Sequence, residues 1–352
     1  MAGVPGASRF NLFMLVAVAA LALPVLPAGA VSVVVKNDIG KWKDTNGVEI
    51  TAESGYVTKF GGLYWWYGRQ GLGSRVRAYS STNLVDWKNE GVVADFGSGA
   101  ACRPVVFFNE TSGKYVLIVG LAAGTRPQLV FSTAAGPRGP FTEVNRIPEP
   151  TGSTMGDVGG FKNDDGEAYV VYNSDRFETN STMVISRLTK ATYTSFSVPE
   201  LHVANHVNGN KREAFHVIKN PANGLFYLFS SKTSGWNPSA AMYKVSRYLY
   251  NFPTTGGNSG FNDGWNRVET SPASTNSFLT QHDMALRIHG TVSGSMFMYI
   301  GDRWPDYADP GVYTASGGEK AWFPLTFGAD GVPRIHGETQ WTLNLDTATW
   351  SP

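Results

Sequence analysis

The stretch KNPANGLFYLFSS, residues 219–231, decides the fold because it joins a turn ending in glycine to a strand rich in aromatic residues. The same arrangement occurs in KFGGLYWWYG (59–68), FNETSGKYVLIVG (108–120), KNDDGEAYVVY (162–172) and HGTVSGSMFMYIG (289–301). The turn glycines, spaced by 51, 53, 58 and 70 residues, are Gly62, Gly113, Gly166, Gly224 and Gly294. Glycine supplies the positive φ that a short chain reversal requires, so each unit is predicted to be a β-hairpin.

A second strand with a serine in or just after it follows each of the first four hairpins. Repeats of this length built from short strands are typical of a β-propeller, and five units predict an all-β, five-bladed β-propeller. No amphipathic stretch longer than about 12 residues competes with this interpretation. The segment 322–345 either finishes the fifth blade or closes the ring, and residues 31–352 are interpreted as one domain.

The composition agrees with a large core. Hydrophobic residues make up 42% and aromatic residues 13% of the 352-residue chain. Only 16% of the residues are charged and the net charge is +1, so neither a nucleic-acid partner nor a basic protein partner is predicted. Cys102 is the single cysteine, so no internal disulfide forms and the core must supply the stability.

The first thirty residues have the form of a secretory signal peptide. Arg9 precedes the apolar run 10–26, and a small-residue cleavage site predicts cleavage after Ala30. The alternative is an uncleaved anchor, but the run is short and Pro24 interrupts it. No later segment is apolar enough to cross a membrane, so a secreted protein is expected. Two glycosylation triplets agree with export, those beginning at Asn109 and Asn180.

The first strand of each propeller blade lines the central axis, so polar side chains at its start converge on one funnel. The residues about ten positions before each turn glycine are Glu53, Cys102, Asp157, Glu213, and Gln281 with Asp283. Carboxylates from separate blades then surround one cavity, and paired carboxylates are the usual equipment for hydrolysis of glycosidic bonds. A second carboxylate nearby is one way to raise the pKa of the acid. This pattern predicts a glycosidase with a polysaccharide substrate.

Each of these residues also has a purely structural interpretation. Glu213 could pair with Arg212 or Lys211 at the strand end, and Asp157 could be a turn residue between glycines. Gln281 could be an ordinary polar strand residue.

Two further interpretations concern the first and fifth blades. Glu53 is expected to be a solvated residue at the rim. Asp302 and Arg303 could form an ion pair that stabilises the fifth blade, and Asp302 is interpreted in this way.

Neither a metal nor another cofactor is predicted. The segment 163–166, Asn-Asp-Asp-Gly, resembles a calcium loop, but a hairpin turn explains it equally well. His202 and His206 have metal spacing only on a helix, and a loop is expected there. The thiol of Cys102 is interpreted as packed, not nucleophilic. The tryptophans able to stack on sugar rings are Trp65, Trp66 and Trp236.

The order of several segments resembles glycoside hydrolase family 43, and among its members the exo-β-1,3-galactanase branch. These segments include LYWWYGR, CRPVVFFNETSGKYV, MGDVGGFKNDDGEAYVVYNSD, REAFHVIKNPANGLFYL, SGWNPS, GDRW and AWFPL. The resemblance covers about residues 44–328. It implies a five-bladed propeller that hydrolyses galactan chains by inversion, without a cofactor, and we expect a monomer.

The resemblance also implies roles for individual residues. Glu213 matches the general acid, Asp157 the aspartate that orients it and tunes its pKa, and Gln281 the glutamine beside the attacking water. The sugar contacts expected from the matched segments and their neighbours are Asn173, Trp236, Asn237 and Arg303. Glu53 stands where most of the wider family has its basic aspartate.

Two positions depart from the galactanase pattern. Cys102 and Arg69 stand where the galactanases usually have glutamates that contact sugar. The first alternative to a galactanase is therefore a catalytically weakened carbohydrate-binding propeller, and the second is a family 43 enzyme acting on arabinan or xylan. A protein-binding propeller would not need Asp157 and Glu213 in adjacent inner strands.

Overall fold

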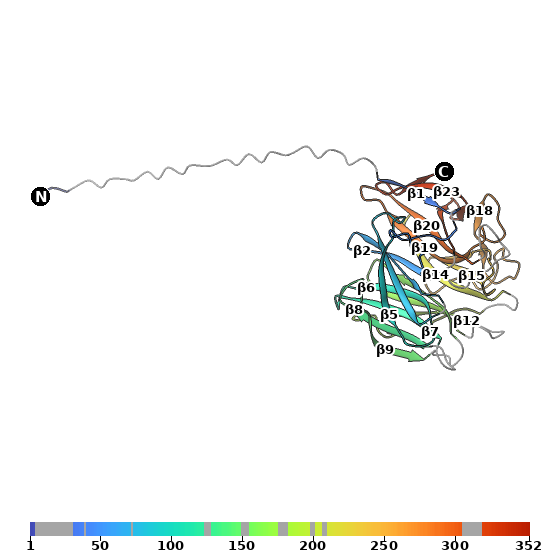
Figure 1. Cartoon of the computed structure of the whole chain (residues 1–352), viewed down its shortest axis with the longest axis horizontal. Coiled ribbons are helices and arrows are strands. Elements are labelled where there is room, and N and C mark those ends of the chain that lie inside the picture. The colour runs from blue at the N-terminus through green and yellow to red at the C-terminus, as the bar shows by residue number, and fades with distance from the viewer. Residues whose placement is uncertain are drawn as a thin grey trace.

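The computed structural model describes residues 1–3, 31–38, 40–71, 73–122, 128–148, 155–174, 182–197, 201–205, 210–304 and 319–352. Every regular element in these ranges is a β-strand, and the strands form six sheets (Figure 1). The propeller predicted from the sequence is present. No helix in the described ranges has the length and hydropathy needed to span a membrane.

Four sheets contain four strands in chain order. The first contains β2 (Glu53–Phe60), β3 (Leu63–Arg69), β4 (Arg75–Ser81) and β5 (Lys88–Asp95). The second contains β6 (Ala100–Asn109), β7 (Lys114–Ala122), β8 (Gln128–Ala134) and β9 (Thr142–Pro148). The third contains β10 (Met155–Lys162), β11 (Ala168–Ser174), β12 (Thr182–Arg187) and β13 (Leu201–Asn205). The fourth contains β14 (Arg212–Asn220), β15 (Leu225–Lys232), β16 (Met242–Ser246) and β17 (Asn266–Arg267).

The two remaining sheets are built from distant parts of the chain. The fifth has the order β18 (Glu269–Ser271), β22 (Pro333–His336), β21 (Glu319–Phe327), β20 (Ser295–Arg303), β19 (Gln281–His289). The sixth has the order β1 (Ser32–Lys36), β23 (Gln340–Asn344), β24 (Thr349–Ser351). In Figure 1, β1 and β23 of the sixth sheet lie beside the C-terminus.

The number of sheets corrects the prediction of five blades. The final segment divides: β21 and β22 complete the fifth sheet, and β23 pairs with β1 from the other end of the chain. This sixth sheet has no glycine-turn hairpin of the repeated kind, so the number of such hairpins in the sequence predicts one sheet too few. The five turn glycines themselves are confirmed, because all of them have φ between 65° and 86°.

Five hydrophobic clusters lie between neighbouring sheets. Because successive side chains on a strand point to opposite faces, one strand supplies two clusters. On β3, Trp65 packs toward the second sheet while Trp66 packs toward the fifth and sixth. Both rings are buried, so the suggested stacking of Trp65 and Trp66 on sugar is wrong.

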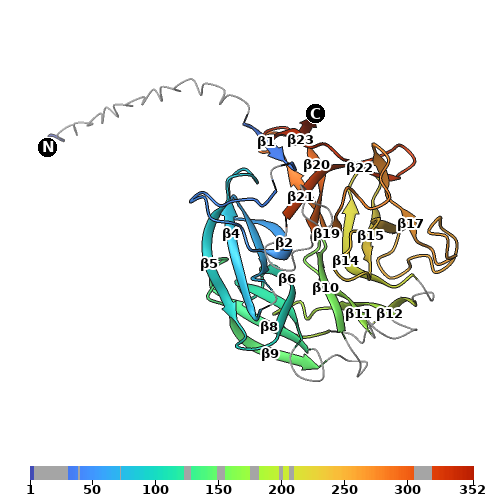
Figure 2. The same ribbon diagram turned by 45° about the vertical axis from the view of Figure 1, so that its right-hand side comes forward.

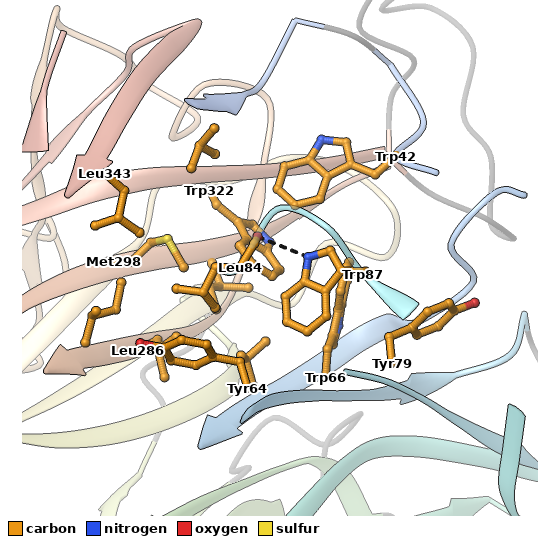
Figure 3. Close-up of a cluster of buried hydrophobic side chains, with 14 of the residues drawn as sticks. Trp42, Tyr64, Trp66, Tyr79, Leu84, Trp87, Leu286, Met298, Trp322 and Leu343 are labelled. Carbon is orange, nitrogen blue, oxygen red and sulfur yellow. Dashed lines mark hydrogen bonds between the residues drawn. The ribbon is translucent and has the colours of Figure 1, made fainter. Parts of the chain in front are cut away.

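The cluster between the first, fifth and sixth sheets is rich in tryptophan (Figure 3). The ring centroids of Trp66 and Trp322 are 4.9 Å apart, as are those of Trp42 and Trp322. The indole of Trp87 donates a hydrogen bond of 3.1 Å to the carbonyl oxygen of Leu84. Trp341 of β23 belongs to the same cluster and its indole donates a hydrogen bond of 2.9 Å to the carbonyl oxygen of Trp322, so aromatic side chains hold the sixth sheet against the fifth.

Candidate active site

The inner strands of the first five sheets, β2, β6, β10, β14 and β19, gather around the middle of the molecule (Figure 2). Each has a break in pairing near its start, between the residues Glu53/Tyr56, Cys102/Val105, Met155/Val158, Glu213/His216 and His282/Met284. A β-bulge redirects side chains and ends regular pairing, and bulges are common beside active sites. The same end of every inner strand is therefore irregular, and the predicted site residues lie there.

Backbone conformation repeats at three of these bulges. Ser54, Arg103 and Ala214 have φ of 50°, 42° and 57°, and each directly follows a predicted site residue. Non-glycine residues rarely adopt this left-handed region, and they do so mostly where the surrounding structure imposes it. Glu53, Cys102 and Glu213 thus occupy equivalent steps, each as the last paired residue before its bulge.

Asp157 does not occupy that step. It lies inside the bulge of β10, one residue before pairing resumes at Val158, and Met155 holds the step equivalent to Glu213. Asp283 has the same position in the bulge of β19, directly before Met284. Both aspartates directly precede the residue at which pairing resumes, although two residues are unpaired in the bulge of β10 and one in the bulge of β19.

A buried arginine connects these two aspartates. Arg103 Nε lies 2.7 Å from Asp157 Oδ2, and Arg103 Nη1 lies 2.6 Å from Asp283 Oδ1. Burial alone would lower the pKa of Arg103, but the charges of Asp157 and Asp283 outweigh it and raise the pKa. Arg103 is not among the site residues predicted from the sequence, although its place beside Cys102, at the start of an inner strand, could have indicated it.

Two glycines bring β10 close to its neighbours. A Cβ on Gly159 would lie 1.7 Å from the carbonyl oxygen of Phe215 on β14. Gly159 follows Asp157 by two residues, and Phe215 follows Glu213 by two residues. The backbones of β10 and β14 are therefore in close contact shortly after Asp157 and Glu213. A Cβ on Gly160 would meet Val105 of β6 at 2.3 Å.

Arg212 has a structural role apart from the site. Its Nε donates to Ser230 Oγ at 3.0 Å, and its Nη2 donates to the carbonyl oxygens of Ser230 and Ala240. Successive side chains of a strand point to opposite faces of the sheet, so Arg212 lies on one face of the fourth sheet and Glu213 on the other. The adjacent charge pair at this strand start therefore separates into a structural cation and a site carboxylate.

Glu53 is buried and not solvated, so the expectation of a rim position is wrong. Its Oε2 accepts a hydrogen bond of 3.0 Å from the backbone N–H of Gly71. Arg69, directly opposite Glu53 in the pairing of β2 and β3, has its Nη1 3.8 Å from Cys102 Sγ. Asn173 is buried, and its Nδ2 donates to the carbonyl oxygen of Arg212 at 2.9 Å.

The side chain of Gln281 holds a loop. Its Nε2 donates to the carbonyl oxygens of Gly235 at 2.6 Å and Asn237 at 2.9 Å, and its Oε1 accepts from Trp304 Nε1 at 2.9 Å. Trp236 is 37% exposed and meets Trp304 edge-on, with ring centroids 4.6 Å apart. Gln281 therefore positions the loop that presents Trp236.

Asp302 and Arg303 do not form the suggested ion pair with each other. Asp302 pairs with the buried Lys320 and accepts a hydrogen bond of 2.5 Å from the backbone N–H of Ser54. Arg303 is buried and donates to the carbonyl oxygens of Asn37 at 2.6 Å and Phe278 at 3.2 Å. These contacts attach the fifth sheet to the segment after β1, and the sugar contact expected of Arg303 stays a prediction.

One cavity of about 610 Å³ lies at the other end of the inner strands, where Lys59, Lys162, Lys219 and Arg287 contribute to its lining. It is not the predicted site. The segment 163–166 forms a hairpin turn in which Gly166 N–H donates to the carbonyl oxygen of Asn163. Within the described ranges, no three His, Cys, Asp or Glu side chains are grouped so that they could hold a metal ion.

Three sequence predictions concern modification or metal residues elsewhere. Asn109 is 1% exposed and its Nδ2 donates to the carbonyl oxygen of Lys190, so it is not an accessible glycosylation acceptor in the folded protein. Asn180 and His206 lie outside the described residues, and His202 is described only as part of β13.

Comparison with known proteins identifies the family. The sequence profile of glycosyl hydrolases family 43 matches residues 48–255, more than half of the chain. No curated protein sequence matches the chain.

Solved structures of exo-β-1,3-galactanases are similar. The enzyme from Phanerochaete chrysosporium, solved with β-1,3-galactotriose, superposes with a TM-score of 0.72 at 26% identity, covering 90% of this chain and 70% of that one. The enzyme from Clostridium thermocellum gives a TM-score of 0.73 at 25% identity, covering 90% and 68%. The resemblance predicted from the sequence is confirmed, and the chain belongs to glycosyl hydrolases family 43 and is a glycosidase.

Proposed function

We propose that the chain is a secreted, inverting exo-β-1,3-galactanase with Glu213 as its general acid. The observation that supports this proposal is the close packing of β10 on β14 at Gly159, two residues after Asp157 and opposite Phe215, two residues after Glu213, from which we infer that the two carboxyl groups lie near each other. Support for the substrate comes from the two exo-β-1,3-galactanases, at 25% and 26% identity. Support for secretion comes from the signal-peptide pattern of residues 1–30, and sequencing the N-terminus of exported protein tests it.

In this mechanism Glu213 protonates the leaving glycosidic oxygen. The ionised carboxylate of Asp157, held in place by Arg103, favours the protonated form of Glu213. An inverting enzyme also needs a carboxylate that activates water. The amide of Gln281 is engaged with the 235–237 loop and Trp304, so we assign the base to the buried Glu53.

The test is Glu213→Gln, which keeps the shape of the side chain and removes the proton. Losing a positioned acid lowers the rate about 10²–10⁴-fold on β-1,3-galactan. An aryl galactoside with a good leaving group needs less protonation, so its hydrolysis falls less. The matched control is Glu269→Gln, because Glu269 pairs with Arg334 on an exposed strand edge of the fifth sheet. Near-normal turnover of galactan by Glu213→Gln would overturn the assignment.

Two other candidates are a carbohydrate-binding propeller with weakened catalysis and a family 43 enzyme that acts on arabinan or xylan. The contact of Arg69 with Cys102 favours both over the galactanase, because neither side chain offers a carboxylate to sugar hydroxyls. Incubation with β-1,3-galactan, arabinan and xylan, followed by product analysis, separates the candidates. Release of monosaccharide from galactan, with an inverted anomeric configuration seen by NMR, supports the galactanase.

A further inference from the structure

Arg69 is a buried cation with few partners. It is 5% exposed, and its Nε makes no hydrogen bond within the described part of the chain. Its one side-chain contact there joins Nη1 to Cys102 Sγ at 3.8 Å. A guanidinium carries five N–H donors and stays charged, whereas a thiol is a weak acceptor. The hydrogen-bonding capacity of Arg69 is therefore largely unused.

Three other buried cations at this end have carboxylate or oxygen partners for their N–H groups. Arg103 contacts two carboxylates, Lys320 pairs with Asp302, and Arg212 donates to three oxygen atoms. Among the described residues, no carboxylate lies within ion-pair distance of Arg69. Burying a guanidinium that no carboxylate contacts directly is costly, so this arrangement does not stabilise the fold.

The place of Arg69 connects it with the site. Cys102 occupies the same bulge step as Glu53 and Glu213, and Arg69 lies directly opposite Glu53 in the first sheet. The guanidinium thus borders the site between the first and second sheets. Resting on the proposed sugar-binding function, we propose that Arg69 binds an anionic group on the sugar, a uronate carboxylate or a sulfate ester.

The chemistry of the guanidinium favours such a group. Its planar fork donates two parallel hydrogen bonds to a carboxylate or sulfate, and charge-assisted bonds are about twice as strong as neutral ones. A neutral hydroxyl satisfies the donors but brings no negative charge into contact with the guanidinium. The acidic sugar is therefore preferred over its neutral counterpart by roughly 10- to 100-fold in affinity.

Calorimetric titration of the full chain with galactose, galacturonic acid and galactose 6-sulfate tests this. The wild type binds at least one anionic sugar more tightly than galactose, and the comparison of the two anions identifies the group. Arg69→Gln removes the preference, and Arg69→Lys keeps part of it. Cys102→Glu also removes it, because the new carboxylate pairs with Arg69. Arg75→Gln is the matched control, since Arg75 pairs with Asp95 at the exposed surface of the same sheet.

Each outcome bears on one proposal. Anionic sugars that bind no more tightly than galactose, a preference that survives Arg69→Gln, or failure of all three ligands to bind overturns the role of Arg69. Hydrolysis of neutral galactan alongside any of these results leaves the galactanase proposal intact. Binding of an acidic sugar that depends on Arg69, without hydrolysis of any galactan, supports the role of Arg69 and overturns the galactanase.

Discussion

Replacing Arg103 by methionine tests the arrangement at the axis. The change keeps much of the volume and leaves the carboxylates of Asp157 and Asp283 without their shared cation. The side chains of Arg103, Asp157 and Asp283 are 8%, 12% and 2% exposed, so water screens the loss poorly. Breaking a buried ion pair by removing one partner costs about 3–5 kcal/mol. That is a large fraction of the roughly 5–15 kcal/mol by which folded proteins are stable.

Urea unfolding at pH 7, followed by tryptophan fluorescence, measures the change in the free energy of unfolding. The control Arg75→Met breaks an ion pair whose side chains are 57% and 42% exposed, and an exposed pair contributes about 0–1 kcal/mol. In Arg103→Met, the added change Asp283→Asn replaces a buried carboxyl group that has lost its cation and restores part of the stability. Equal effects of Arg103→Met and Arg75→Met would refute the conclusion that Arg103 holds the two aspartates.

Three further predictions concern the neighbouring strands. Burial lowers the pKa of His216 to about 4 from 6.5, so its contribution to stability is present above pH 6.5 and is lost as the pH falls toward 4, by up to ~1.4 kcal/mol per pH unit. Between pH 7 and 4.5, the free energy of unfolding of His216→Gln should therefore change less with pH than that of the wild type. Gly159→Ala places a Cβ against the carbonyl oxygen of Phe215 and should destabilise by about 1–3 kcal/mol or more, and an unchanged urea midpoint would contradict this packing. Gln281→Leu releases the loop carrying Trp236, so the fluorescence of that exposed ring should change and KM for galactan should rise; unchanged values would show that the amide does not position the loop.

The hairpins could be predicted from the sequence because their cause is local. A glycine at a fixed place in a turn, followed by an alternating strand, specifies a reversal without any distant contact. The positions of Glu53, Cys102 and Glu213 at the starts of inner strands followed from counting back from these glycines, and the structure places all three at one kind of bulge.

Counting did not predict the different step of Asp157. Its side chain lies inside a bulge, and a bulge shifts the register by an amount that the local sequence does not reveal. The burial of Glu53 was missed for a related reason, because the residues that cover it come from neighbouring segments.

The all-β repeat, the hairpin turns and the membership of family 43 follow from the amino-acid sequence, since each depends on residues close together along the chain. Only the tertiary structure decided the number of sheets, because β1 and β23 come from opposite ends of the chain. It alone decided that Arg103 joins Asp157 to Asp283 and that Arg69 meets Cys102. Charged groups from separate sheets meet only after the ring has closed, so their pairing depends on packing between sheets and not on any local pattern.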